Sequence, residues 1–338
     1  MGNTNSTKLK LLHLLDILEK DTDEDHPISM PELQRKLSER DIDSERKSIY
    51  RDIKALEDFG IEISGYEQNR QGYFLLSRDF DLSELRFLMD AVLSSRCITI
   101  KKSKELIAKL EGLTSRHLAK QLSKNRDIDK RIKHSNEEFY YNIDKISRAI
   151  SEDKKISFQY YEYNKAKEKI LRRDGHIYKL SPYDLVWNED FYYVIGIHDN
   201  HDNFTNYRID RMHHIDIGDS TRRLLEDFQA KGIFYNTTDY MKRTFKMYGG
   251  ELTNVELKFS NELINVVIDR FGKESNISEM DNDHFKLTAE VNAGEGFLLW
   301  ILQFGEKVQI LYPEALRKRL VHKIDKMREQ YKILYKDT

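Results

Sequence analysis

The sequence predicts a multidomain α+β protein, and three observations indicate it. Apolar residues recur at helical spacing up to about residue 150, strand-like runs rich in aromatic residues follow from Lys155, and the last third alternates strands with helices. At 338 residues the chain is long enough for two domains or three small ones. We expect three helices with a small hairpin over 1–78, a helical linker over 79–150, a small β-barrel over 151–220 and a βαββαβ unit with a terminal helix over 221–338.

Composition narrows the class of protein. With 56 basic and 58 acidic residues the net charge is −2, so any binding to nucleic acid must come from local patches. The single cysteine, Cys97, excludes a disulfide framework and a cysteine-based zinc cluster, and it fits a reducing compartment. The longest apolar run, Phe297 to Leu302, is too short to span a bilayer, and the first ten residues lack the apolar core of a signal peptide. We expect a cytoplasmic protein with no membrane partner.

The first 78 residues contain three helix patterns and two short β-rich runs. The second helix has Ser29 as its cap and Pro31 in its first turn, and the third ends at Gly60. The helices are expected over Lys8–Lys20, Ser29–Arg40 and Ser44–Phe59, and the β-runs over Ile61–Ser64 and Gly72–Leu76. Three helices followed by a hairpin are the layout of a winged helix-turn-helix.

The third helix predicts two chemically different faces. Ile49, Ile53 and Leu56 fall on one side because positions four and seven residues apart nearly share a helical face. The opposite face and its flanks carry candidate DNA-binding residues, and the hairpin, or wing, adds one more. The candidates are Arg46, Lys47, Tyr50, Arg51 and Lys54 on the helix and Arg70 on the wing. Arginine reads guanine in the major groove of duplex DNA, and lysine and tyrosine suit backbone oxygens. In the alternative interpretation these cations pair with Glu45, Asp52, Glu57 and Asp58 on a solvated surface.

A resemblance sharpens this prediction. The run SIYRDIKALEDFGIEI, followed by GYFLL, resembles the DeoR-like winged helix over roughly residues 8–77. The resemblance implies Ser48 and Arg51 at the DNA, with Asp52 orienting Arg51 or a neighbour. Asn69 and Gln71, beside Arg70, are further candidates for contact with a phosphate or a minor-groove edge.

In the linker, the lysine-rich face around Lys101, Lys102 and Lys104 is most simply a solvated helix surface.

The segment from Phe158 to Arg211 has the most unusual composition. Eight tyrosines crowd it, together with Ser181, Arg208 and Arg211. Aromatic faces beside guanidinium groups suit a single-stranded nucleic acid or a nucleotide, because bases stack and phosphates need positive charge. For any one tyrosine, ordinary packing in the core or on the surface remains the simpler interpretation.

This segment resembles the WYL domain of bacterial transcription regulators. The matching parts are ISFQYYEY, LSPYDLV, YYVIG and YRIDRM, with Tyr192, Tyr193 and Val194 in place of the tripeptide that names the family. The resemblance implies an Sm-like barrel that binds an effector and signals to the DNA-binding domain. It carries over five effector-binding candidates, which are Tyr160, Ser181, Tyr193, Arg208 and Arg211.

The order of elements in the last third is the ferredoxin-like arrangement. It resembles the carboxy-terminal extension, or WCX domain, of the same regulators, which often takes part in dimer contacts. We therefore expect a homodimeric transcription regulator that is not an enzyme. Two alternatives stay open: an enzyme acting on nucleotides that a winged helix targets to DNA, and an RNA-binding adaptor.

Other groupings of polar residues are weak candidates, and we expect neither a cofactor nor a metal. His198, Asp199, His201 and Asp202 lie at a probable hairpin turn without a third ligand placed by spacing. His213 and His214 would point to opposite faces of a strand.

Overall fold

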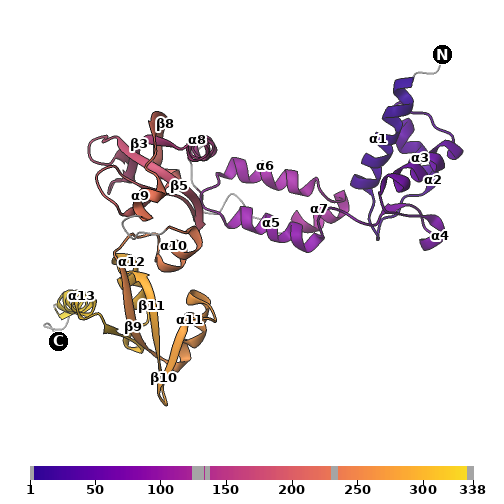
Figure 1. Ribbon diagram of the computed structural model, residues 1–338. Helices are drawn as coiled ribbons and strands as arrows, with labels where there is room; N and C mark the ends of the chain where they lie inside the picture. The colour runs from indigo at the N-terminus through magenta and orange to yellow at the C-terminus, as the bar shows by residue number, and fades with distance from the viewer. Residues whose placement is uncertain (1–3, 124–132, 134–137, 230–234, 333–338) are drawn as a thin grey trace. The chain divides into compact units, whose positions relative to one another are not determined.

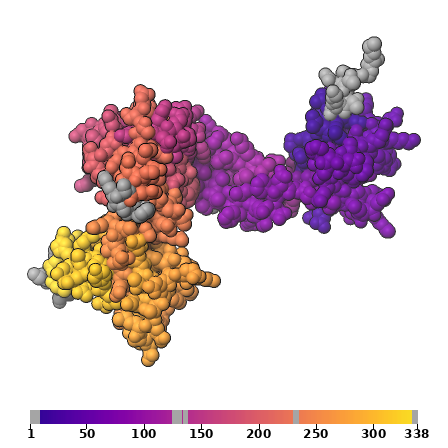
Figure 2. Space-filling view, in the orientation of Figure 1, coloured from indigo at the N-terminus to yellow at the C-terminus, as the bar shows by residue number. Residues whose placement is uncertain are grey.

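A computed structural model describes residues 4–123, 133, 138–229 and 235–332 of the chain. The chain divides into two compact units, Met1–Glu137 and Glu138–Thr338. Figure 1 gives the elements of each unit, and Figure 2 shows side chains filling the spaces between the ribbons. No helix in the described part of the chain is both long and apolar enough to cross a membrane.

The first unit begins with three helices and a two-stranded hairpin. The elements are α1 (Thr4–Asp21), α2 (Met30–Ser38), α3 (Arg46–Phe59), β1 (Ile63–Ser64) and β2 (Phe74–Leu75), with the short helix α4 (Tyr66–Asn69) between the strands. Gly60 ends α3 with a φ of 105°, a left-handed conformation that glycine adopts without strain. The predicted order of elements is confirmed, although both strands are shorter than expected and α4 lies within the predicted polar connection.

The acidic segment between α1 and α2 is partly buried. Asp23 is buried and contacts the imidazole of His26 at 2.6 Å and the hydroxyl of Ser115. Burial raises the pKa of Asp23, but the hydrogen bonds from Ser115 and His26 outweigh it and hold this pKa below its usual value. His26 in turn stacks on His117, with ring centroids 3.7 Å apart. These contacts attach the segment to the helices that follow the hairpin.

Three helices complete the described part of the first unit: α5 (Leu82–Ser94), α6 (Ile100–Glu111) and α7 (Arg116–Ser123). Their common core contains Leu85, Met89, Leu93, Ile107 and Leu122. Cys97 is fully buried, with its sulfur 3.3 Å from the hydroxyl of Ser95. On α6, Lys101 and Lys104 are exposed, and Lys102 pairs with Glu105.

The second unit opens with α8 (Phe139–Ser151), which packs on a six-stranded antiparallel sheet. The strands are β3 (Lys154–Tyr163), β4 (Lys169–Leu171), β5 (Tyr178–Asn188), β6 (Phe191–Ile197), β7 (Phe204–Arg208) and β8 (Met212–Thr221). They are ordered β4-β3-β5-β6-β7, and β8 pairs with β3.

The position of α8 differs from the expectation that residues up to 150 belong to the linker. Phe139, Ile146 and Ala149 are buried, and the Asn142 amide donates to the Met212 carbonyl at 3.1 Å. Because its apolar face packs against the strands of the sheet, α8 belongs to the second unit. The linker segment predicted over 79–150 therefore ends before α8.

The last part of the chain has the predicted βαββαβ order. After α9 (Leu225–Gln229) and α10 (Thr237–Arg243) come β9 (Leu252–Ser260), α11 (Ile264–Phe271), β10 (Asn276–Asp281), β11 (His284–Asn292), α12 (Glu295–Leu302), β12 (Val308–Tyr312) and α13 (Glu314–Lys332). The sheet order is β10-β11-β9-β12, and all its pairs are antiparallel. α12 is buried on most sides, with Phe297 and Ile301 in a core that includes Val255, Leu257 and Phe259.

Candidate nucleic-acid interface and ligand site

Helix α3 has the two faces that its sequence predicts. Ile49, Ile53 and Leu56 are buried in the core shared with α1 and α2. Lys47 and Arg51 are exposed on the outer face, and within the described residues the Arg51 Nε donates its one hydrogen bond to the Lys47 carbonyl, at 3.4 Å. Within the described residues neither cation has a carboxylate partner. These two charges are therefore available to an external anion.

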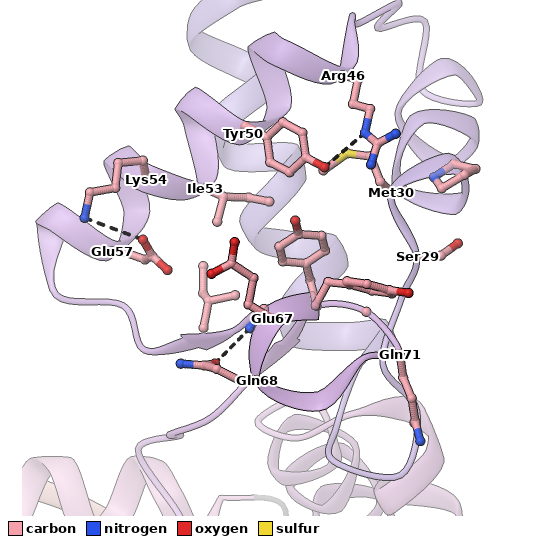
Figure 3. A pocket seen from close by; sticks show the side chains of 16 residues that line it. Ser29, Met30, Arg46, Tyr50, Ile53, Lys54, Glu57, Glu67, Gln68 and Gln71 are labelled. Atoms are coloured by element: carbon pink, nitrogen blue, oxygen red, sulfur yellow. Dashed lines mark hydrogen bonds and ion pairs between the residues drawn. The ribbon is translucent and has the colours of Figure 1, made fainter.

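Arg46 and Tyr50 form a pair at the edge of this face. The Arg46 Nε donates to the Tyr50 hydroxyl at 3.0 Å, and its guanidinium lies 5.5 Å from the centre of the tyrosine ring. Both side chains are exposed, and Figure 3 shows them at one side of the cavity beside the hairpin. The pairing fixes the direction of Arg46 and leaves its charge uncompensated by any carboxylate in the described part of the chain.

Lys54 pairs with carboxylates of its own helix, as the alternative interpretation of a solvated surface predicts. Its ammonium lies 3.1 Å from Asp58 and 3.7 Å from Glu57, one turn further along α3. The hydrogen bond and charge of Asp58 raise the pKa of Lys54 above its ordinary value. Lys54 is exposed, but it must exchange these carboxylates for phosphate in order to bind DNA.

Ser48 and Asp52 point toward α1 instead of toward the outer face. The ammonium of Lys10, which is almost fully buried, donates to the Ser48 hydroxyl at 2.5 Å and pairs with Asp52 at 2.7 Å. A buried lysine needs such partners, so Ser48 and Asp52 hold α1 against α3. Ser48 is half-buried, and its contact with DNA stays a prediction. Asp52 pairs with Lys10, whereas the described residues show no contact between Asp52 and Arg51.

The hairpin presents Arg70 but uses Asn69 internally. Arg70 is exposed and has a φ of 58°. The Asn69 amide donates to the Ser64 hydroxyl and the Gly72 carbonyl, and its oxygen accepts from the backbone of Gln71 and Gly72. Asn69 therefore shapes the turn and has little capacity left for a phosphate, whereas Gln71 remains exposed.

A cavity of about 560 Å³ separates α3 from the hairpin. Tyr50, Tyr66 and Tyr73 line it together with Arg46, and Figure 3 shows Gln68 and Gln71 on the hairpin side. Burial and a hydrogen bond with Tyr50 raise the pKa of Tyr73 to about 12, so this hydroxyl remains protonated at neutral pH. The cavity wall thus offers hydroxyl and amide groups and the carboxylates of Glu57 and Glu67, together with the guanidinium of Arg46.

Arg208 is the centre of the predicted effector site. Its guanidinium forms two hydrogen bonds with Asp210, at 3.1 and 2.6 Å, and lies 3.3 Å from the centre of the Phe191 ring. Burial lowers the pKa of Arg208, but the bonds and charge of Asp210 outweigh it and raise the pKa above its ordinary value. Sequence reasoning missed Asp210 and Phe191, although the two-residue spacing from Arg208 to Asp210 was visible.

Three of the other four candidates lie near Arg208. The Tyr160 hydroxyl accepts from the Arg208 backbone N–H at 3.3 Å, and burial raises the pKa of Tyr160 to about 12. Tyr193 on β6 is paired with Arg208 on β7, and burial also raises its pKa. Arg211 is half-buried in the turn Ile209–Arg211. Its positive charge partly opposes the rise that burial causes in the pKa of Tyr160 and Tyr193.

Ser181 does not join this group through any contact in the described residues. It is fully buried on β5, and its hydroxyl accepts from the backbone N–H of Arg223 at 3.1 Å. Arg223 is 42 residues further along the chain, so the sequence carries no signal for this contact. Ser181 anchors the segment after β8, and without exposed surface it cannot touch a ligand unless the strand moves.

Several tyrosines fill the interior of the sheet, as ordinary packing predicts. Phe158 contacts the rings of Tyr160, Tyr178 and Tyr207, with centroids 5.0 to 6.5 Å apart. His198 joins this cluster by hydrogen bonds to the Lys179 carbonyl and the Tyr207 hydroxyl, and burial lowers its pKa. The candidates for a ligand site are therefore reduced to the smaller group around Arg208.

The two histidines on β8 do not point to opposite faces, so that prediction is wrong. The rings of His213 and His214 contact each other with centroids 3.9 Å apart, instead of facing opposite sides. β8 has a bulge against β3 at this point, and His214 has a φ of 49°, so the alternation of side chains is broken. Among the described residues, no three His, Cys, Asp or Glu side chains are grouped to hold a metal ion.

Two protein-family models match the chain: a WYL domain at residues 141–217 and a WCX domain at residues 251–328. The first match begins within α8, in agreement with the packing of that helix. No curated protein matches the chain.

Among solved structures, proteasome accessory factor B/C (PafBC) of Arthrobacter aurescens is similar at 16% identity over 96% of this chain and 49% of that one. The chain thus spans about half the length of that protein, and a TM-score of 0.28 does not establish a shared overall fold.

Proposed function

Because the chain contains a WYL domain and a WCX domain, we propose that it is a transcription regulator that binds duplex DNA through α3 and responds to an effector. The observation that carries the DNA-binding part is the outer face of α3, where Arg46, Lys47 and Arg51 are exposed without carboxylate partners in the described part of the chain. Side chains of this kind suit a helix in the major groove, with Arg70 on the wing reaching the adjacent backbone.

Selection from a random duplex library tests the DNA-binding part. A regulator enriches one motif, and its affinity for that motif falls steeply as salt rises because bound cations release counterions from DNA. Failure to enrich any duplex, with salt-sensitive binding to RNA retained, would favour the RNA-binding alternative instead.

The effector part of the proposal places an anionic ligand at Tyr160, Tyr193, Arg208 and Arg211. Support comes from the half-buried Arg208, whose guanidinium lies over the Phe191 ring and whose strand partner is Tyr193. A nucleotide or a single-stranded nucleic acid offers both a ring to stack and a phosphate to pair with these arginines. Ser181 is left out of this site because it is fully buried.

A double substitution tests the effector part. Arg208→Ala with Arg211→Ala is expected to abolish the response of DNA binding to oligonucleotides or nucleotides while leaving DNA affinity without effector near normal. Because this variant also removes the partner of the buried Asp210, circular dichroism checks that it is folded before binding is measured. A folded double variant that still responds fully would refute the site. Turnover of a nucleotide by catalytic amounts of protein would favour the enzyme alternative.

We also propose a homodimer on a two-fold symmetric operator. Helix α13 supports it: Leu316 and Leu320 pack into the core, whereas Val321, Ile324, Met327 and Tyr331 are exposed at helical spacing. Sedimentation of the whole chain tests the proposal, and Ile324→Glu is expected to shift a dimer toward monomer. A monomer at the concentrations that occupy DNA would refute it.

A further inference from the structure

A shallow groove of about 490 Å³ lies on the second unit and is lined by none of the residues of the Arg208 group. The end of β5, helix α10 and helix α11 supply its lining: Val186, Trp187, Asn188, Thr237, Thr238, Met241, Lys242 and Arg270. The lining contains two cations and no carboxylate. The volume is within the range of small-molecule sites.

Arg270 is a half-buried cation that forms no ion pair with any residue in the described part of the chain. One terminal nitrogen donates to the Thr244 carbonyl at 2.6 Å, and the guanidinium lies 4.2 Å from the centre of the Phe245 ring. Its Nε is buried and has no hydrogen-bond partner, and no ion pair of Arg270 occurs within the described residues.

Burial lowers the pKa of Arg270, and the charge of Glu189 only partly opposes this. A desolvated charge is stabilised by a counter-ion and by filled hydrogen bonds, which an anion in the groove would supply.

Trp187 offers a fixed aromatic surface on the same groove. Its side chain is 48% exposed, which is unusual for so large an apolar group. The indole Nε1 donates to the Glu189 carbonyl at 2.6 Å, and the centroids of the Trp187 and Tyr192 rings are 6.1 Å apart. These two contacts hold the indole ring in place. Val186 and Met241 add apolar lining, which suits a flat ring.

Lys242 on α10 provides a second positive charge. It is exposed and has no carboxylate partner in the described part of the chain, and the Thr238 hydroxyl is exposed one turn before it. An anion bound to Arg270 would meet this ammonium on its solvent side. The groove therefore combines an apolar aromatic surface with two cations.

We propose that this groove binds a small planar aromatic anion, with its ring against Trp187 and its carboxylate or phosphate on Arg270 and Lys242. Trp187 lies within the matched WYL domain and Arg270 within the matched WCX domain. A bound ligand therefore bridges two domains. This site shares no lining residue with the proposed effector site, although Tyr193 of that site is the strand partner of Val186, and it does not depend on DNA binding.

Intrinsic fluorescence tests the proposal, because the chain has only two tryptophans and Trp300 is almost fully buried. The purified whole chain is titrated with benzoate, adenosine monophosphate, adenosine and inorganic phosphate up to about 10 mM, a range that detects weak binding. We expect saturable quenching by benzoate, adenosine monophosphate or both, which identifies a carboxylate or a phosphate ligand. Adenosine and phosphate, which each carry half of the required chemistry, should bind at least about tenfold more weakly.

Matched variants complete the test. Trp187→Phe should remove the quenching and Trp300→Phe should retain it. Arg270→Gln should weaken binding at least about tenfold, and the exposed Lys242→Gln about two- to fivefold, while Lys273→Gln serves as the surface control.

Because Arg270 also contacts Thr244, circular dichroism checks its variant, and Lys242→Gln decides the matter if that variant is misfolded. The proposal is overturned if neither ring-bearing anion quenches, if adenosine quenches equally well, or if both charge variants bind normally.

Discussion

Arg51 on α3 and Arg208 at the end of β7 carry the same guanidinium group in two different settings. Arg51 is exposed, and its only contact in the described structure is the Lys47 carbonyl. Arg208 is 19% exposed, and Asp210, which holds it by two hydrogen bonds, has no exposed surface. One charge is solvated and free to move, whereas the other is already paired inside the protein.

This difference predicts how the two regions would select the ligands that we propose for them. A solvated arginine contributes to attraction for any polyanion and gains specificity only where it meets a base edge. A paired and desolvated arginine accepts a ligand anion only if that ligand competes with Asp210 or adds to it in the right geometry. We therefore expect broad, salt-dependent binding at α3 and narrower chemical selectivity at Arg208.

The largest expected effect is on stability at the paired arginine. Asp210→Ala leaves Arg208 as a half-buried charge without its counter-ion, which should cost about 3–5 kcal/mol of the free energy of unfolding. Thermal unfolding followed by circular dichroism measures the loss as a lower Tm. Arg51→Ala, the matched change at the solvated arginine, should leave Tm almost unchanged.

A double variant makes this test stricter. Replacing both members, as Arg208→Met with Asp210→Leu, should recover much of the stability because no buried charge remains unpaired. If Asp210→Ala unfolds no earlier than wild type, the ion pair is not what holds Arg208, and the contrast between the regions fails.

The next effect is on DNA affinity. Arg51→Ala should weaken binding to the selected duplex by about 1–3 kcal/mol and relax preference at one base pair if Arg51 reads a base. Fluorescence anisotropy with the preferred duplex and single-base variants measures both quantities. Arg86→Ala, an exposed arginine on α5, provides the control. Equal affinities for wild type and Arg51→Ala would remove this residue from the interface.

Local periodicity predicted which side chains of α3 are buried and which are exposed. Contacts between residues far apart in the sequence could not be predicted in this way. The burial of Ile49, Ile53 and Leu56 and the exposure of Arg51 follow from the 3.6-residue repeat, so sequence alone identified them. Ser48 lies on the same helix, but its partner Lys10 is 38 residues earlier, and no local pattern encodes that contact. The bulge at His214 likewise depends on pairing with β3, which the sequence of β8 does not contain.

A smaller effect separates the two sides of α3 itself. Ser48→Ala removes one hydrogen bond to the buried Lys10 and should cost about 1 kcal/mol of stability. Its effect on DNA affinity should be much smaller than that of Arg51→Ala, because the hydroxyl points toward α1. Thermal unfolding and anisotropy on the same preparations compare the two quantities. A loss of affinity as large as that of Arg51→Ala, with Tm unchanged, would place Ser48 in the DNA interface.

The smallest effect concerns Lys54, which is exposed like Arg51 but paired like Arg208. Asp58→Asn removes the nearer of its two carboxylates and also removes a negative charge beside the face that we propose to meet DNA. Both changes favour phosphate binding, so affinity should rise by about two- to fivefold at low salt. Asp269→Asn, an exposed aspartate on α11, makes the same charge change in the other unit and should have no effect. Weaker binding by Asp58→Asn would mean that the Lys54 ion pair positions the helix for DNA, and solvated charge alone would then no longer explain the outer face of α3.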